Sequence, residues 1–390
     1  MPDKANITPR VFKWARESAR MTRETAAAKV PVSADKLKEW EEGNSQPTIR
    51  QAQILAKAYK RPFALLFLPE IPKDFQPLQD FRKKGSKTLG TASIFIIREI
   101  QQKQEWMSEI NEENNEDKLS IVGKFSINDN PQIVADDILK VLDIDPLNYQ
   151  NENPIREWID KAESNGIFIS RTSFIHTKLK LVKEEIQGFV IADSYAPFVF
   201  INSDDWDASQ LFTLVHELAH IWIAESGISN EIESELINKS EFNSIELFCN
   251  QVAADALIPV QFMKSLNTNI FNSIKEVFTV SKRLGVSSFA FLVRALNLNI
   301  IPLNIYQKLK TEAEAEYKEF LKREEEKKAE QKEKKGGPSP YLLRVNKNSR
   351  LFTQIVLDGF HGGLIEPALA SILLNTPTNK FQKLEAQLYR

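Results

Sequence analysis

Cysteine, histidine and long apolar runs are the scarcest features of this 390-residue sequence, which has one cysteine, Cys249, and four histidines. A single cysteine excludes an intramolecular disulfide framework and a cysteine-rich metal site, and it is typical of a reducing compartment. No stretch approaches the roughly 20 uninterrupted apolar residues that span a bilayer, and the first residues lack the apolar run of a signal peptide. We therefore expect a cytoplasmic protein that does not cross a membrane.

An excess of charge of one sign is also missing. The 51 Lys and Arg residues nearly balance the 53 Asp and Glu residues, so the formal net charge is −2. Any surface for nucleic acid must therefore be local. The chain is too long for one ordinary core, and its apolar fraction of 42% supports packed domains, so we expect two or three of them.

Residues 1–70 have the pattern of a series of short amphipathic helices. Pro31, Gly43 and Pro47 fall between the helical segments and interrupt them. The five predicted helices are Thr8–Arg16, Thr22–Lys29, Ser33–Glu41, Thr48–Lys57 and Arg61–Phe67.

The second and third of these helices are typical of a helix-turn-helix. Alanines at positions 26 to 28 allow close packing, and Ser33 is a natural N-cap for the helix that would enter the major groove. Residues 1–70 contain 13 Lys or Arg against 8 Asp or Glu, which favours contact with DNA phosphates. The third helix also carries several acidic residues, so a protein-docking bundle is the alternative. The residues expected to contact DNA are Arg23, Ser33, Asp35, Lys36 and Lys38.

Beyond residue 70 the pattern predicts an α+β fold that is mostly helical. We expect a linker at 71–90, a larger domain at 91–312, a charged helical tether at 313–340 and a C-terminal helical region at 341–390. The predicted strands of a small sheet are Gly166–Arg171, Gly188–Asp193 and Pro197–Asn202. A long helix is predicted to begin at about Asp207, directly after this sheet.

That helix contains the motif His216-Glu217-x-x-His220. Residues four apart lie about 40° apart around a helix, so both imidazoles can reach one ion. Glu217 lies beside them, where it can act on a water molecule. The motif therefore predicts a Zn²⁺ site on His216 and His220, with Glu217 as the catalytic residue.

A catalytic zinc needs a third protein ligand, and Glu246 is the best candidate. It lies in SIELFCNQVAADALIP, which predicts a helix that ends at Pro259, and it shares one helix face with Asn250 and Ala253. Small residues on that face allow two helices to approach closely. The weaker candidates are Asp255, Glu241, Glu231, Glu233 and Glu235.

The remaining histidines and the cysteine receive simpler interpretations. We expect His176 to be an exposed loop residue between strands and His361 to be structural. Cys249 is interpreted as a small buried hydrophobic residue.

Together these residues resemble the ImmA/IrrE family of metallopeptidases, in the architecture where an XRE-type helix-turn-helix precedes a zincin-like peptidase domain. The resemblance covers most of residues 5–300 and leaves the tether and residues 341–390 outside it. The stretches that carry it are EWEEGNSQPTIRQAQILAKAYKRPFALLFLP with PKDFQPLQDFR, then FVFINSDDWDASQLFTLVHELAHIWI, then IELFCNQVAADALIP with VSKRLGVSSFAFLVRAL.

The resemblance implies a zinc endopeptidase that cleaves a DNA-binding repressor or an antitoxin-like protein and so relieves repression. Carried over, His216, His220 and Glu246 match the metal ligands and Glu217 the catalytic glutamate. The acidic third helix departs from the usual DNA-reading pattern. The rival hypotheses are a DNA-binding regulator, or an antitoxin, whose zinc domain senses or binds a partner without proteolysis.

Overall fold

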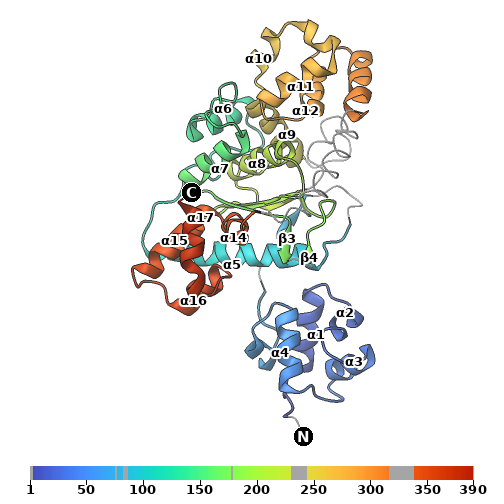
Figure 1. Cartoon of the computed structure of the whole chain (residues 1–390), viewed down its shortest axis with the longest axis vertical. Helices are drawn as coiled ribbons and strands as arrows, with labels where there is room; N and C mark the ends of the chain where they lie inside the picture. The colour runs from blue at the N-terminus through green and yellow to red at the C-terminus, as the bar shows by residue number, and fades with distance from the viewer. Residues whose placement is uncertain are drawn as a thin grey trace. The chain divides into compact units, whose positions relative to one another are not determined.

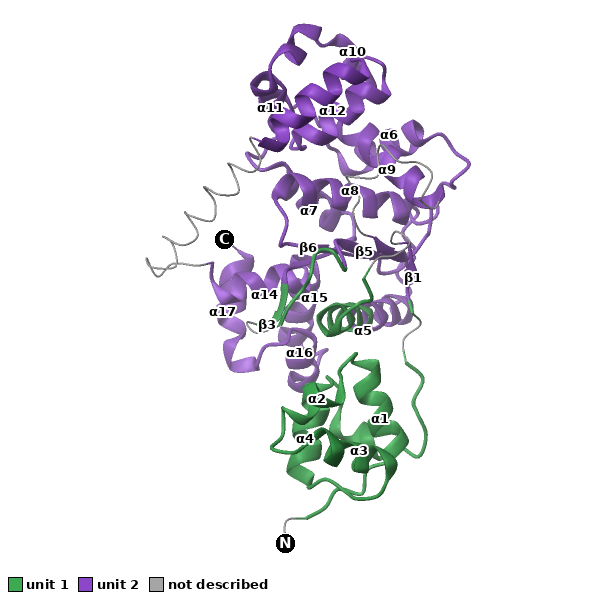
Figure 2. Cartoon of the chain, turned by 90° about the vertical axis from the view of Figure 1, so that its right-hand side faces the viewer, with its two compact units in different colours: residues 1–77, 87–101, 174–185 green, residues 78–86, 102–173, 186–390 purple. Residues whose placement is uncertain are grey.

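The computed structural model describes residues 3–74, 77–81, 87–176, 179–229, 244–315 and 338–389. Within these ranges the chain is mostly helical with a small mixed sheet, in agreement with the predicted α+β class. No helix of the described ranges combines the length and apolar character that crossing a membrane requires. The chain divides into two compact units (Figure 2): unit 1 contains residues 1–77, 87–101 and 174–185, and unit 2 contains residues 78–86, 102–173 and 186–390.

Local capping sets the helix ends in unit 1. Helix α3 begins after Ser33, whose hydroxyl accepts a hydrogen bond from the Lys36 N–H, and ends at Gly43 with φ 80°. Helix α4 begins with a reciprocal capping box between Thr48 and Gln51. The four helices are α1 (Pro9–Ser18), α2 (Arg23–Ala27), α3 (Ala34–Glu42) and α4 (Ile49–Ala58).

The fifth predicted helix of this segment is wrong in type. Phe63–Phe67 forms the 3₁₀ helix η1, because Pro62 and Pro69 leave too few residues between them for a stable α-helix. Unit 1 also contains the first part of α5 (Thr91–Glu113) and a hairpin of β3 (Phe174–His176) and β4 (Leu179–Lys180).

A five-stranded mixed sheet lies at the centre of unit 2, with the strand order β1-β7-β5-β6-β2. Strand β2 pairs with β6 in parallel, and β5 pairs antiparallel with both β6 and β7. The three predicted strands are present with slightly shifted ends. The five strands are β1 (Gln79–Asp80), β2 (Phe168–Thr172), β5 (Gly188–Ile191), β6 (Phe198–Asn202) and β7 (Gly227–Ser229).

Strand β1 lies inside the segment 71–90 that the sequence predicts as a linker. It pairs in parallel with β7, with Gln79 opposite Gly227, and the Phe81 N–H donates to the Ile228 carbonyl at 3.1 Å. A two-residue strand leaves no periodic pattern, and its partner is far along the chain, so local sequence does not reveal it. Part of this segment therefore belongs to the sheet.

Helices cover both faces of the sheet (Figure 1). Helix α8 packs against β5 and β6 and beside α9, and Val199 and Ile201 belong to the apolar core on this side. Residues 303–315 are also helical. The elements of this half are α6 (Pro131–Leu142), α7 (Pro154–Ser164), α8 (Asp207–Trp222), α9 (Ser244–Leu257), α10 (Val260–Ser265), η3 (Thr268–Asn272), α11 (Ile274–Arg283) and α12 (Ser288–Asn297).

The C-terminal helices cover the other face, at β2. The Ser170 hydroxyl donates to the Lys347 carbonyl at 2.6 Å, and the buried Phe352 ring packs against the rings of Phe168 and Phe198. Glu163 at the end of α7 accepts a hydrogen bond from the Ser349 hydroxyl at 2.6 Å. These helices are α14 (Pro340–Asn348), α15 (Arg350–His361), α16 (Pro367–Leu373), η4 (Thr378–Lys380) and α17 (Phe381–Leu388).

Candidate metal centre

Helix α8 supplies the two histidines of the predicted motif. Asp207 lies in its first turn, where a negative charge stabilises a helix N-terminus, and the residues from Ser209 to Trp222 are all buried. His216 and His220 are one turn apart, and their Nε2 atoms lie 3.1 Å from each other. Both imidazoles are therefore held, out of solvent, toward one point.

Glu246 reaches the same point from the first turn of α9, which packs closely on α8. Its Oε2 lies 3.3 Å from His216 Nε2, and its Oε1 lies 3.1 Å from His220 Nε2. One potential ligand atom from each of the three residues lies within 4.8 Å of the other two. The structure thus brings together the three predicted ligands from two neighbouring helices.

The donor chemistry of this cluster fits a metal ion. Asn250 Oδ1 lies 2.9 Å from His216 Nδ1 and accepts the hydrogen of that nitrogen, which leaves the Nε2 lone pair free for a metal. Two imidazole nitrogens and one carboxylate are a common ligand set for catalytic zinc. The two Nε2 atoms and the carboxylate lie within 3.1–3.3 Å of one another, and a shared cation would be held by all three side chains at this point.

The pKa directions favour the protonation states that a metal requires. Burial alone would raise the pKa of Glu246, but the charges and hydrogen bonds of His216 and His220 lower it to about 2. Burial lowers the pKa of His220, and the nearby Glu246 offsets part of this effect. The carboxylate and the neutral imidazole are the forms that bind a cation.

Glu217 lies next to the cluster but is not part of it. Its carboxyl is fully buried, and neither oxygen makes a hydrogen bond of normal geometry within the described part of the chain. Burial raises the pKa of Glu217 well above its usual range, the charge of Glu246 raises it further, and the Ser229 hydroxyl acts in the opposite direction. A buried carboxyl beside such a cluster is suited to proton transfer.

Gly188 of β5 makes room for this carboxyl. A Cβ at position 188 would lie 2.6 Å from Glu217 Oε1 and 2.7 Å from Thr213 Cγ2, closer than real contacts allow. Neither Gly188 nor the hydrogen bond from His216 to Asn250 was part of the sequence prediction. The hydrogen bond to Asn250 could have been predicted, because Asn250 lies four residues after Glu246 on the same helix face.

Of the weaker candidates for the third ligand, only Asp255 lies among the described residues, and it is not part of the cluster. Asp255 lies on another side of α9 and forms a buried ion pair with Arg294. Glu231, Glu233, Glu235 and Glu241 lie outside the described residues.

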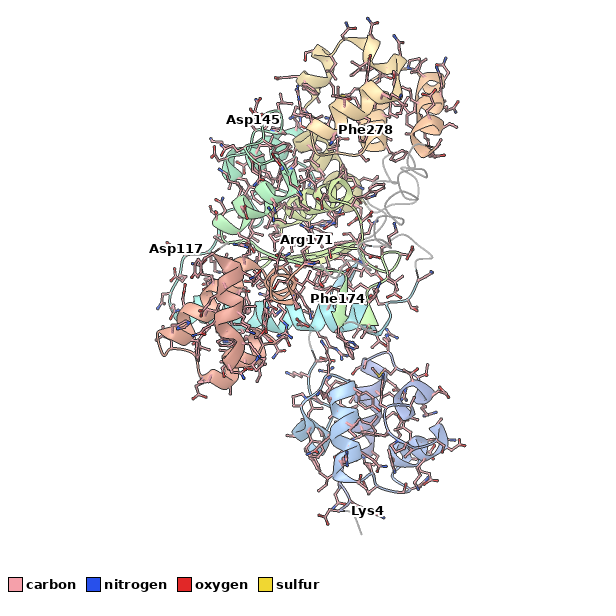
Figure 3. The ribbon with its side chains drawn as sticks, in the orientation of Figure 1. Lys4, Asp117, Asp145, Arg171, Phe174 and Phe278 are labelled. Atoms are coloured by element: carbon pink, nitrogen blue, oxygen red, sulfur yellow. The ribbon has the colours of Figure 1, made fainter. Side chains whose placement is uncertain are left out.

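The two remaining histidines and the cysteine are not part of the cluster. His176 is exposed, but it ends strand β3, whose first residue Phe174 is labelled in Figure 3, so the predicted loop position is wrong. His361 is exposed and pairs with Glu385 at 2.5 Å. Cys249 is fully buried, and burial raises the pKa of its thiol.

The residues expected to contact DNA lie on α2, on α3 and at the N-cap of α3. Ser33, Asp35 and Lys38 are exposed, and Lys36 is half-buried. Each basic side chain has an acidic partner on α3. These ion pairs are Arg23 with the buried Glu41 at 2.8 Å, Lys36 with Glu39 at 2.5 Å and Lys38 with Glu42 at 3.7 Å.

Two histidines and a glutamate from adjoining helices, with a second buried glutamate beside them, are the arrangement of a metallohydrolase. Residues 162–296, about a third of the chain, match the family model Peptidase_M78, described as the IrrE N-terminal-like domain. This range contains α8 and α9 with all four residues, and the match supports a metallopeptidase of the ImmA/IrrE type. No curated protein matches the sequence.

Proposed function

We propose that the protein is a zinc-dependent endopeptidase with Zn²⁺ on His216, His220 and Glu246. The observation that carries this proposal is the convergence of these three side chains beside the buried carboxyl of Glu217. When bound, zinc supplies a Lewis acid that polarises the scissile carbonyl and makes a water easier to deprotonate.

The chain's own residues supply positioning and proton transfer. Asn250 fixes the ring of His216 through the Nδ1 hydrogen bond. Glu217 accepts a proton from the attacking water on one of its carboxyl oxygens and delivers it to the nitrogen of the leaving amine.

The test compares zinc content and hydrolysis in matched variants. Wild type is expected to bind one zinc per chain, and His216→Ala to bind none. Glu217→Gln is expected to keep its zinc but to lose about 10²–10⁴-fold in peptide hydrolysis, because the general base is gone. Cleavage that persists at the wild-type rate in Glu217→Gln would contradict the proposed mechanism.

We further propose that residues 1–70 bind DNA and that the substrate is a DNA-binding repressor or an antitoxin-like protein. The local basic excess and the exposed outer side of α3 support DNA contact, although the ion pairs on α3 already compensate much of this charge. Replacing Lys36 and Lys38 together by Gln should weaken duplex binding and reduce its salt dependence by about one to two phosphate contacts. The double replacement Lys282→Gln and Arg283→Gln in unit 2 is the control. Absence of duplex binding by wild type at low salt would favour protein docking instead.

Full burial of the cluster favours a second candidate function. Among the four residues, none exposes more than 1% of its surface, as expected for a centre that holds the fold together or grips a partner without proteolysis. The protein would then be a DNA-binding regulator or antitoxin. Stable capture of a repressor by wild type and Glu217→Gln alike, with no cleavage by wild type, would support this candidate.

A further inference from the structure

One edge of the sheet in unit 2 lies directly against the candidate metal centre. The Phe81 ring, which follows β1, stacks on the imidazole of His220 with ring centroids 5.2 Å apart and planes inclined by 16°. Phe81 is 4% exposed. The backbone of Gln79 and Asp80 pairs with β7, so these residues occupy the outer edge of that strand.

The absence of a side chain at Gly227 of β7 leaves space for Phe81 and β1. A Cβ at position 227 would lie 2.2 Å from Phe81 Cε2 and 2.9 Å from the carbonyl oxygen of Gln79. The three nearest atoms all belong to Gln79 and Phe81. The missing side chain at this position therefore makes room for the ring of Phe81 and for the backbone of β1.

Peptide hydrolysis requires the buried cluster to become accessible to a substrate. A scissile carbonyl has to reach His216, His220 and Glu246, which are 0%, 0% and 1% exposed. If β1 leaves, the edge of β7 presents backbone N–H and C=O groups, and the space beside Gly227 becomes available to another side chain. An extended peptide can use both features, because strand addition gives backbone hydrogen bonds and a pocket for a side chain gives selectivity.

We propose that the outer edge of β7, with the space at Gly227, is a binding site for an extended peptide carrying an aromatic or large apolar side chain, and that residues 78–81 occupy it as an intramolecular inhibitor. The proposal deepens the proposed peptidase function and rests on it for the identity of the displacing ligand as substrate. The occupation of the edge by β1 does not depend on zinc.

The test measures access to His220 in the metal-free protein with diethyl pyrocarbonate, which carbethoxylates accessible neutral imidazoles. Modification is followed residue by residue by mass spectrometry. His361, whose side chain is 59% exposed, is the internal reference within each sample. In wild type, His220 is expected to react far more slowly than His361.

Two variants open the edge in different ways. Phe81→Ala removes the ring from His220, and Gly227→Ala retains the ring but places a methyl group where it lies. Each is expected to raise the rate at His220 at least about tenfold relative to His361. The matched control is Phe271→Ala, which removes a ring of similar burial, 5% exposed, that packs on Phe291 elsewhere in unit 2.

A capped peptide of the sequence PLQDF, residues 77–81, is then added at millimolar concentration to Phe81→Ala. It is expected to slow the reaction of His220 again. Unchanged rates in both edge variants, or an equal rise in Phe271→Ala, would overturn the inhibitory role, and a peptide without effect would overturn the peptide site. Because the readout needs neither zinc nor hydrolysis, a failure here is separate from a failure of the proposed peptidase function.

Discussion

Replacement of Asn250 by Leu is expected to weaken zinc binding without unfolding the protein. Leu has a similar volume but no acceptor, so the buried Nδ1–H of His216 would lose the partner that it has at 2.9 Å. Leaving one buried donor unpaired costs about 1–3 kcal/mol. Loss of such outer partners typically lowers metal affinity about 10–100-fold, which lies in the same range.

Competition with a chelator of known zinc affinity at neutral pH measures this effect. Asn250→Asp retains an acceptor for the Nδ1–H and should stay closer to wild type than Asn250→Leu does. Gln251→Ala is the control on the same helix, since Gln251 bonds to Asp255 rather than to the cluster. A folded Asn250→Leu protein that binds zinc within about threefold of wild type would refute the reasoning, because an unpaired buried donor should cost more.

Three further predictions concern other parts of the chain. Gly188→Ala should leave zinc affinity unchanged but lower hydrolysis about 100-fold, because the added Cβ displaces the carboxyl of Glu217; equal losses of zinc and activity would contradict it. Burial raises the pKa of Glu163 to about 7 from an ordinary value of 4.5, so the free energy of unfolding should fall by about 3 kcal/mol as pH rises from about 4.5 to 7, since the unfolded carboxyl loses its proton first. Thermal melts of Glu163→Gln should lack this slope, and an unchanged slope would exclude Glu163 as its source. Glu41→Gln should destabilise unit 1 by about 3 kcal/mol in denaturant melts, because the buried Arg16 loses its buried charged partner and keeps only the half-exposed Glu17; a loss below about 1 kcal/mol would contradict a buried pair.

Elements with a strong local pattern could be predicted from the sequence. Helices α8 and α9 follow from their apolar periodicity and from Pro259, and the strands around Phe168 and Phe198 follow from their Phe, Val and Ile content. The position of Glu246 beside the two histidines could also be predicted. Glu246 lies on the same face of α9 as the small residues that let this helix approach α8.

Features that depend on distant pairing could not be predicted in this way. Strand β1 exists because β7, almost 150 residues later, offers a free edge, and nothing within PLQDF indicates that partner. The roles of Gly188 and Gly227 depend on which side chains arrive opposite them, Glu217 and Phe81. A glycine in a strand indicates that another group packs closely against it, but the sequence does not show which residue that is.

The seam between β2, α7 and the C-terminal helices has a practical consequence. Glu163, Ser170 and Phe168 on one side meet Ser349, Lys347 and Phe352 on the other, through buried hydrogen bonds and ring contacts. Noncovalent contacts therefore hold the C-terminal helices against β2 and α7. Two co-expressed polypeptides, one ending at residue 315 and the other starting at residue 338, should associate and co-elute in size-exclusion chromatography.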